Sequence, residues 1–174
     1  AEITLSDSVT SIGAGAFSGC VLLNDIVLPE GLQSIGAGAF SGCTGLENFT
    51  FPQQMTRIEN EAFSGCTKLA AVDLPEHIVS IGNEAFAGCT GILRVTLPET
   101  MTSVGTGAFQ ECTGITEVLL PGKITQISDG LFSGCEALRT VTFAGGVETI
   151  GKGAFQGCVL LEQVALPATL TAIG

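Results

Sequence analysis

The chain has 174 residues and carries 17 acidic against 6 basic side chains, which gives a net charge of -11. Nucleic acids and anionic membrane surfaces repel such a charge, so the composition argues against both as partners. Apolar residues make up 45% of the chain, enough for an extended core, yet no apolar run approaches the roughly 20 residues that a membrane helix needs. We therefore expect no nucleic-acid partner and no membrane insertion in this segment.

A repeat of 23 residues runs through the whole sequence without insertion or deletion. Its clearest marks are a phenylalanine and a cysteine three residues apart, from Phe17 and Cys20 to Phe155 and Cys158. One copy cannot bury its apolar face alone, so stacked copies must share one continuous core. We predict a single solenoid over 1–174, with seven full repeats and a partial eighth. We expect it to be a fragment of a longer protein, because neither end carries a polar capping repeat.

The first part of each copy predicts a short strand. Its third and fifth positions are apolar, as in Ile26 and Leu28, and a proline follows in six copies. Apolar residues two apart are typical of a strand, and proline ends it. The ninth and twelfth positions are apolar again, and glycine follows in six of eight copies. This pattern predicts a second short extended piece that ends in a turn.

The corner of each copy reads Ala-Phe-x-x-Cys, as at Ala16, Phe17 and Cys20. Separations of three and four residues match helical spacing, so we predict one helical turn that points all three side chains inward. The predicted fold is a mainly β solenoid of stacked short parallel strands with one short helical turn in each 23-residue repeat.

The seven cysteines are interpreted as buried core residues. Parallel side chains in register leave their Cβ atoms about 4.8 Å apart, whereas a disulfide prefers about 3.8 Å, and seven is an odd number. Zinc sites need thiolates that converge from short Cys-x-x-Cys pairs, and the sequence has none. We therefore interpret the cysteines as small, buried and unreactive thiols in the core.

Resemblances to catalytic motifs are weak. Residues 146–152 fit the start of a phosphate-binding loop, but Gly153 stands where a hydroxyl should coordinate magnesium. In the dinucleotide-like Gly13 to Gly15 stretch the third glycine is one place late. His77 is the only histidine and falls at an exposed position, so a nucleophile has no base beside it. We predict no enzyme activity, no metal site and no cofactor.

An acidic row follows the strand-ending proline. Calcium could bridge such a row because it accepts several oxygen ligands, but a spacing of one carboxylate per coil favours a solvated edge. The row contains Asp7, Glu30, Gln53, Glu76 and Glu99.

The outward positions of the first strand are the candidate contact surface. They form two parallel rows along the sheet, which is where solenoids usually bind partners. Interface hot spots are enriched in Trp and Tyr, and the chain has neither. A passive spacer is therefore the alternative interpretation. The candidate residues are Asn48, Asp73, Arg94, Thr96, Glu117 and Leu119.

The copies LNDIVLPEGLQSIGAGAFSGCTG from Leu23 and LAAVDLPEHIVSIGNEAFAGCTG from Leu69 carry a family resemblance. They resemble the BspA-like class of leucine-rich repeats, in which copies read approximately L-x-x-I-x-[IL]-P-x-x-V-x-x-I-G-x-x-A-F-x-x-C-x-x. The departures keep the 23-residue register, and they are Ser6 and Ala144 for proline, Glu59 and Ser128 for glycine, and Leu131 for alanine.

The resemblance implies a function as well as a fold. Members of this class look like secreted or cell-surface proteins of bacteria and some protists. They attach to host matrix glycoproteins such as fibronectin and fibrinogen, or to other cells. The resemblance therefore implies a non-catalytic adhesion module with protein partners, and a structural spacer or stalk is the alternative. Exposed apolar coil ends also predict end-to-end self-association.

Overall fold

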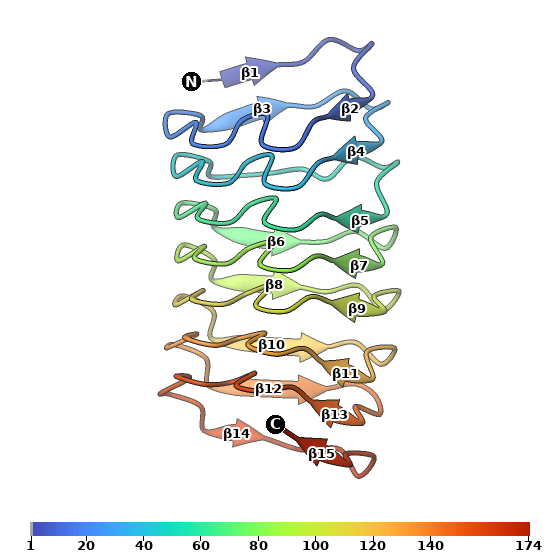
Figure 1. Cartoon of the computed structure of the whole chain (residues 1–174), viewed down its shortest axis with the longest axis vertical. Coiled ribbons are helices and arrows are strands. Elements are labelled where there is room, and N and C mark those ends of the chain that lie inside the picture. The colour runs from blue at the N-terminus through green and yellow to red at the C-terminus, as the bar shows by residue number, and fades with distance from the viewer. Residues whose placement is uncertain (1) are drawn as a thin grey trace.

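The computed structural model describes residues 2–174, which form a regular stack of coils (Figure 1). In each coil the chain runs along one side, turns, and returns along a second side before a corner leads into the next coil. This is the predicted β-solenoid. We number the coils from the N-terminus: coil 2 covers 24–46, coil 3 covers 47–69, coil 4 covers 70–92, coil 5 covers 93–115, coil 6 covers 116–138 and coil 7 covers 139–161, with coil 1 before and coil 8 after them.

The first side of the stack carries the strands that precede the prolines. Third-position residues such as Val72 and Val118 face the core, while their neighbours in the strand face solvent. Neighbouring strands are parallel and paired one repeat apart, as Val118 is with Val141. We call this side the first sheet, and its strands are β1 (Glu2–Thr4), β3 (Asp25–Val27), β6 (Ala71–Asp73), β8 (Arg94–Thr96), β10 (Glu117–Leu120), β12 (Thr140–Phe143) and β14 (Gln163–Val164).

The second side carries the short extended pieces predicted ahead of the glycines. Each strand has two residues, of which the second is apolar and, in every coil before the last, buried. These strands are again parallel and one repeat apart, as Ile81 is with Val104. We call this side the second sheet, and its strands are β2 (Ser11–Ile12), β4 (Ser34–Ile35), β5 (Arg57–Ile58), β7 (Ser80–Ile81), β9 (Ser103–Val104), β11 (Gln126–Ile127), β13 (Thr149–Ile150) and β15 (Ala172–Ile173).

Coil 3 departs from the prediction because residues 48–50 do not form a strand. Phe49 and Phe51 occupy the third and fifth positions, where most other coils have smaller aliphatic side chains. Their rings pack edge-on against Phe63, with centroids 4.6 and 5.8 Å away. The segment that carries these two rings is the one that forms no strand.

A column of stacked phenylalanines fills the centre of the solenoid. The seven corner rings lie 5.3 to 5.9 Å apart and are nearly parallel, with interplanar angles of 4 to 12°. The five from Phe40 to Phe132 are fully buried, whereas Phe17 and Phe155 at the two ends are half-buried. No polar or charged residue is buried in the described part of the chain. Each ring therefore couples its coil to the coils above and below.

The helical turn predicted at each corner is wrong, since residues 2–174 contain no helix. In coil 1 the amide of Ser18 donates to the carbonyl of Gly15 at 3.0 Å, which closes a turn. The amide of Phe17, however, donates to Ala39 of coil 2 at 2.8 Å. Gly15 and Gly19 have φ of 63° and 72°, left-handed values that interrupt a helical path. The corner is a series of tight turns in which alternate amides bond to the next coil.

The cysteines are free and lie against the phenylalanine column. The six from Cys43 to Cys158 are buried, and each S–H donates to the carbonyl of a phenylalanine in the preceding coil at 3.0 to 3.2 Å. Burial raises the pKa of Cys43 to about 11 and that of Cys135 to about 12. The predicted core role is confirmed, and the thiols add a ladder of hydrogen bonds between coils.

Candidate binding face on the first sheet

The outward residues of the first sheet form an exposed surface along the solenoid. Successive side chains of a strand alternate between faces, so the second and fourth positions of each copy point away from the core. We call these two rows the strand face. In coils 4 to 6 they include five of the predicted site residues, all of them exposed: Asp73, Arg94, Thr96, Glu117 and Leu119.

A charged network links strands β6 and β8 on this face. One nitrogen of the Arg94 guanidinium donates to Asp73 at 2.7 Å, and the Thr96 hydroxyl donates to the other oxygen of that carboxylate at 2.8 Å. Arg94 first, and Thr96 second, hold the pKa of Asp73 below its ordinary value. The Arg94 and Asp73 side chains are 68% and 53% exposed, so their ion pair contributes at most about 1 kcal/mol to stability. Its main effect is to orient the guanidinium on the face.

A groove of about 450 Å³ lies on the strand face across coils 5 to 7. Leu119 contributes an apolar wall and is 50% exposed. Arg94 and Glu117 add one positive and one negative charge to the same lining. An aliphatic surface with one charge of each sign suits a polypeptide side chain better than a purely anionic or cationic ligand. The full lining is Arg94, Val95, Thr96, Leu97, Glu117, Val118, Leu119, Thr140 and Thr142.

The structure separates Asn48 from the other predicted residues. Asn48 is exposed in the irregular segment of coil 3, and neither groove on this side includes it. By contrast, Arg94, Thr96, Glu117 and Leu119 share the groove, and Asp73 joins them through its two hydrogen bonds.

A larger groove of about 830 Å³ lies between coils 2 and 3 and was missed by the sequence analysis. Val27 is an exposed aliphatic residue at its edge, and Asp25 and Glu30 make its surroundings acidic. The available signal was the Phe49 and Phe51 pair, which marks the coil where the strand is lost. The lining is Asp25, Ile26, Val27, Leu28, Pro29, Glu30, Gly31, Thr50, Phe51, Pro52, Gln53 and Gln54.

The other candidate sites from the sequence are the acidic row, His77 and the phosphate-loop-like stretch. The acidic row is exposed, and residues 2–174 hold no group of three His, Cys, Asp or Glu side chains placed to bind a metal ion. His77 is half-buried, contrary to expectation, and its ring nitrogen Nε2 lies 3.1 Å from the carbonyl of Pro52 in coil 3. In the phosphate-loop-like stretch, Val147 and Ile150 are buried core residues.

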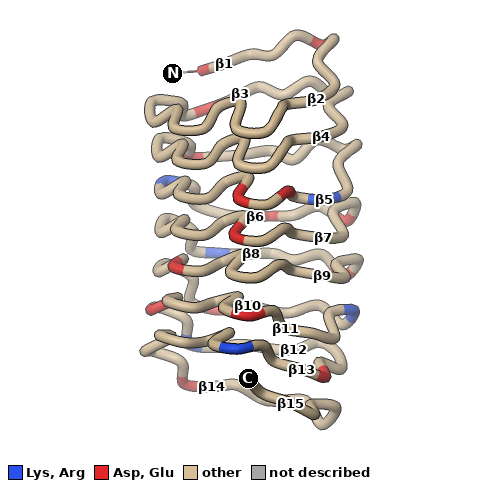
Figure 2. The backbone as a smooth tube through the Cα atoms, in the orientation of Figure 1, with Lys and Arg blue, Asp and Glu red and all other residues tan. Residues whose placement is uncertain are grey.

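Acidic side chains are spread along the whole solenoid, and the few basic ones are scattered among them (Figure 2). The distribution offers no basic stripe of the kind that tracks a nucleic-acid backbone. In the part of the chain that the structure describes, no helix has the length and apolar character needed to span a bilayer.

Three solved structures share this architecture. A leucine-rich repeat protein from Bacteroides ovatus is 34% identical, with a TM-score of 0.95 over 99% of this chain and 47% of that one. A leucine-rich repeat protein from T. pallidum is 32% identical, with a TM-score of 0.85 over 92% of this chain and 77% of that one. A leucine-rich cell surface protein from Faecalibacterium prausnitzii is 26% identical, with a TM-score of 0.66 over 99% of this chain and 59% of that one.

The chain spans less than half of the Bacteroides protein and about three quarters of the T. pallidum protein. Comparison with curated proteins finds no match. The family model of the BspA type leucine-rich repeat region matches residues 1–81 and 68–174, with six copies of the repeat. With its 23-residue coils, its phenylalanine column and this match over its whole length, the chain belongs to the BspA-type leucine-rich repeat family.

Proposed function

We propose that the chain is a non-catalytic protein-binding module that uses the strand face of coils 4 to 6 as its contact surface. The observation that carries this proposal is the groove beside Leu119, where an exposed aliphatic wall and two opposite charges lie on β8 and β10, two neighbouring strands that are not paired with each other. Membership of a leucine-rich repeat family supports the same role, because solenoids of this kind present extended binding surfaces.

Coils 4 and 5 of the strand face are suited to binding because they are already ordered. Strands β6 and β8 are paired in register, and the network around Asp73 fixes the Arg94 and Thr96 side chains. A surface that is ordered before binding loses less conformational entropy when a partner arrives. Repeated coils also allow several weak contacts to act together, which raises the overall affinity.

The finer proposal concerns the partner and the location. The resemblance described above points to host extracellular-matrix glycoproteins, and one structural neighbour is itself named a cell surface protein. We therefore propose a secreted or cell-surface location, with matrix glycoproteins such as fibronectin and fibrinogen as the partners to test first.

A passive spacer is the second candidate. It is favoured by the pairing of charges within the chain itself: Arg94 with Asp73 on the strand face, and Arg139 with Glu162 at 2.7 Å between coils 7 and 8. Charges that already neutralise one another leave less electrostatic attraction for a partner. The two candidates differ in whether a change confined to the strand face abolishes binding.

The experiment compares binding to immobilised fibronectin and fibrinogen by biolayer interferometry. The test variant carries Asp73→Lys, Arg94→Glu and Glu117→Lys, all on the strand face. The matched control carries Glu136→Lys, Lys152→Glu and Glu148→Lys, which are exposed residues away from that face and change the net charge equally. Circular dichroism checks that both variants are folded.

The proposal expects saturable binding by the unmodified chain and the control, and at least about tenfold weaker binding by the strand-face variant, since interface charge reversals cost several kcal/mol. Equal binding by the unmodified chain, the control and the strand-face variant would show that the strand face is not the contact surface. No binding by any of them would support the spacer.

A further inference from the structure

The second sheet is interrupted at two places in the stack, and the first sheet is interrupted at one of them and beside the other. The second sheet is divided between β4 and β5 and again between β9 and β11, which are the boundaries between coils 2 and 3 and between coils 5 and 6. The first sheet is divided between β8 and β10 at the second of these boundaries, and it lacks a strand in coil 3 beside the first. Figure 1 shows the wider separation between β4 and β5 and between β9 and β11.

Hydrogen bonds on the second side confirm the interruption. At ordinary boundaries the amide of the tenth position donates to the preceding coil, as Val79 does to Thr56 at 2.8 Å and Thr102 to Val79 at 2.9 Å. Thr56 and Thr125 hold the equivalent position just after the two boundaries. Within residues 2–174 their amides make no such bond.

The first side opens fully at the second boundary and in part at the first. The amide of Leu74 donates to Thr96 at 3.1 Å and ties coil 4 to coil 5. Leu28 and Leu97 hold the equivalent position in coils 2 and 5. Over the described range neither of their amides bonds to the next coil, and neither does that of Phe51 in coil 3, which has no first-sheet strand. Across the first boundary the amide of Glu47 still donates to the carbonyl of Asn24 at 3.3 Å.

The corners, in contrast, remain closed at both boundaries. The amide of Phe40 donates to Ala62 at 2.8 Å between coils 2 and 3, and the amide of Phe109 donates to Leu131 at 3.0 Å between coils 5 and 6. The thiol of Cys135 still donates to the carbonyl of Phe109 at 3.1 Å. The second boundary is open on both sides, the first is open on the second side and partly open on the first side, and both are closed at the corner, so each has the shape of a wedge.

The cause is the residue at the thirteenth position of the repeat. A β-carbon placed on Gly82 would lie 2.5 Å from the backbone nitrogen of Asn60 in the preceding coil, too close for a non-bonded carbon atom. Glu59 and Ser128 hold this position directly after the two boundaries and do carry a β-carbon. Their coils must separate on the sheet sides. The same 2.5 to 2.7 Å approach to the preceding backbone nitrogen occurs at Gly36, Gly105, Gly151 and Gly174.

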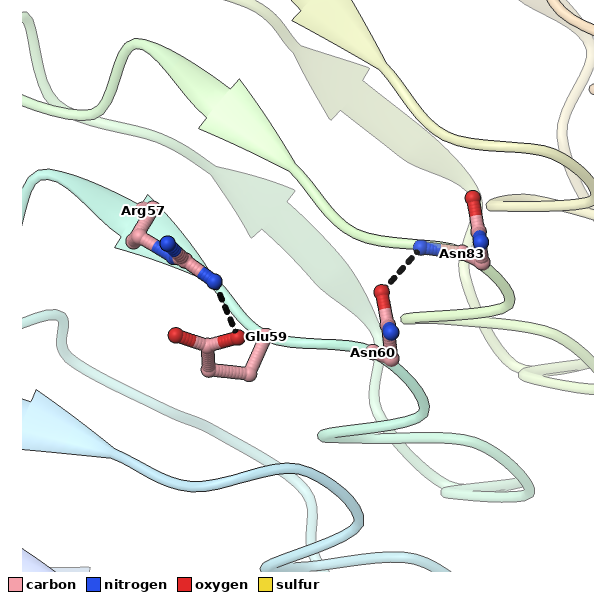
Figure 3. A network of polar contacts seen from close by, with 4 residues as sticks. All are labelled: Arg57, Glu59, Asn60 and Asn83. Atoms are coloured by element: carbon pink, nitrogen blue, oxygen red, sulfur yellow. Dashed lines mark hydrogen bonds and ion pairs between the residues drawn. The ribbon is translucent and has the colours of Figure 1, made fainter.

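The Ser128 and Glu59 side chains, which stand in place of glycine, form hydrogen bonds that are compatible with the wider spacing between coils. The Ser128 hydroxyl donates to the carbonyl of Val104, which would otherwise receive the bond from the amide. The Glu59 carboxylate pairs with Arg57 of the preceding strand β5, at 2.6 Å (Figure 3). At the next boundary, between coils 3 and 4, the Asn60 side chain accepts a hydrogen bond from the amide of Asn83 at 2.8 Å.

From this geometry we propose that the solenoid consists of three stiff blocks, residues 2–46, 47–115 and 116–174, which bend against one another about the closed corners at the two wedge boundaries. The grooves of about 830 and 450 Å³ lie across these same boundaries. Bending at the corners therefore changes the width of both grooves while the core column stays stacked. This inference does not depend on the identity of a partner.

Amide hydrogen exchange followed by NMR tests the proposal in the intact chain. Local opening exposes unbonded amides first. In the unmodified protein we expect the amides of Thr56 and Thr125 to exchange at least about tenfold faster than those of Val79 and Thr102. In the Ser128→Gly variant the amide of Thr125 should slow by about the same factor, while that of Thr56 stays fast.

Two further variants serve as controls. Glu59→Gly should slow Thr56 and leave Thr125 fast, and Gly105→Ser should open a new boundary and accelerate Thr102. Should Gly105→Ser fail to fold, the comparison within the unmodified protein still decides. Equal protection of Thr125 and Thr102 in that protein, or no change at Thr125 in Ser128→Gly, would overturn the proposal.

Discussion

The phenylalanine of each corner is the residue that joins one coil to the next. Phe86 is fully buried, and its ring lies 5.4 Å from both Phe63 and Phe109. Nearly parallel rings at this distance add stacking energy to the burial of their apolar surface. A smaller side chain at this position would leave a cavity between its own coil and the coils on either side, so the repeat tolerates little change there.

We expect Phe86→Ala to lower the free energy of unfolding by about 3–5 kcal/mol, because it removes a buried ring and leaves a cavity. Urea unfolding followed by circular dichroism measures this loss. The matched control is Phe155→Ala, where the ring is half-buried and stacks on one side, so the loss should be smaller. A loss below about 1 kcal/mol for Phe86→Ala would contradict the role of the column.

The buried thiols make stability depend on pH in the alkaline range. Burial raises the pKa of Cys43 to about 11 and that of Cys135 to about 12, from an ordinary value of 9.0. The folded state thus favours the neutral thiol. Its contribution to stability is complete below pH 9 and is lost as the pH rises toward 11 and 12.

We therefore expect the melting temperature to fall steadily above pH 9, and to fall less steeply in Cys135→Ala. Differential scanning calorimetry from pH 7 to pH 11 measures both curves. A melting temperature that stays constant up to pH 11 in the unmodified chain would show that the thiols do not contribute in this way.

At the scale of the elements, spacing between coils is decided by the thirteenth position. We expect Gly82→Ala to cost about 1–3 kcal/mol, because its β-carbon has no room against the backbone of Asn60. Gly13→Ala is the matched control, since no atom lies within 4 Å of a β-carbon there. Thermal unfolding of both variants tests the claim, which equal melting temperatures would refute.

The strands could be predicted from the sequence, whereas the corner turn could not. Apolar residues two apart before a proline leave few alternatives to a strand, and the constant 23-residue period fixes the register. Spacings of three and four at Ala16, Phe17 and Cys20 are shared by a helix and by successive tight turns. The choice between them depends on bonds to the next coil, such as that from Phe17 to Ala39, which a single copy does not contain.

Residues that depart from the repeat pattern changed the local structure in ways that the 23-residue period does not predict. Glu59 and Ser128 keep the register, as expected, but they separate the coils because of one β-carbon each. Phe49 and Phe51 keep the apolar pattern, yet their segment forms no strand and their rings pack edge-on against Phe63.

At the scale of the whole molecule, the net charge of -11 works against the compact state. We expect the melting temperature to rise between about 10 and 500 mM NaCl as salt screens this repulsion. CaCl₂ at equal ionic strength should give the same rise, because the acidic row is a solvated edge. A distinctly larger effect of calcium would show that the row binds the ion.

The candidate site was predictable only in part. Alternation along a strand identifies the exposed rows, so Asp73, Arg94, Thr96, Glu117 and Leu119 were found on one face. The grooves depend on where the sheets are interrupted, and that is a property of several coils together. For the same reason Asn48 was grouped with the others, although its segment does not join the sheet.

Contact through the strand face is tested most directly by site-specific photo-crosslinking to fibronectin and fibrinogen. A benzophenone amino acid replaces either Leu119 on the strand face or Val79 on the second side, two aliphatic residues that are 50% and 38% exposed. The account predicts a crosslinked product from position 119 and little or none from position 79. Equal crosslinking from both positions, or crosslinking from position 79 alone, would contradict it.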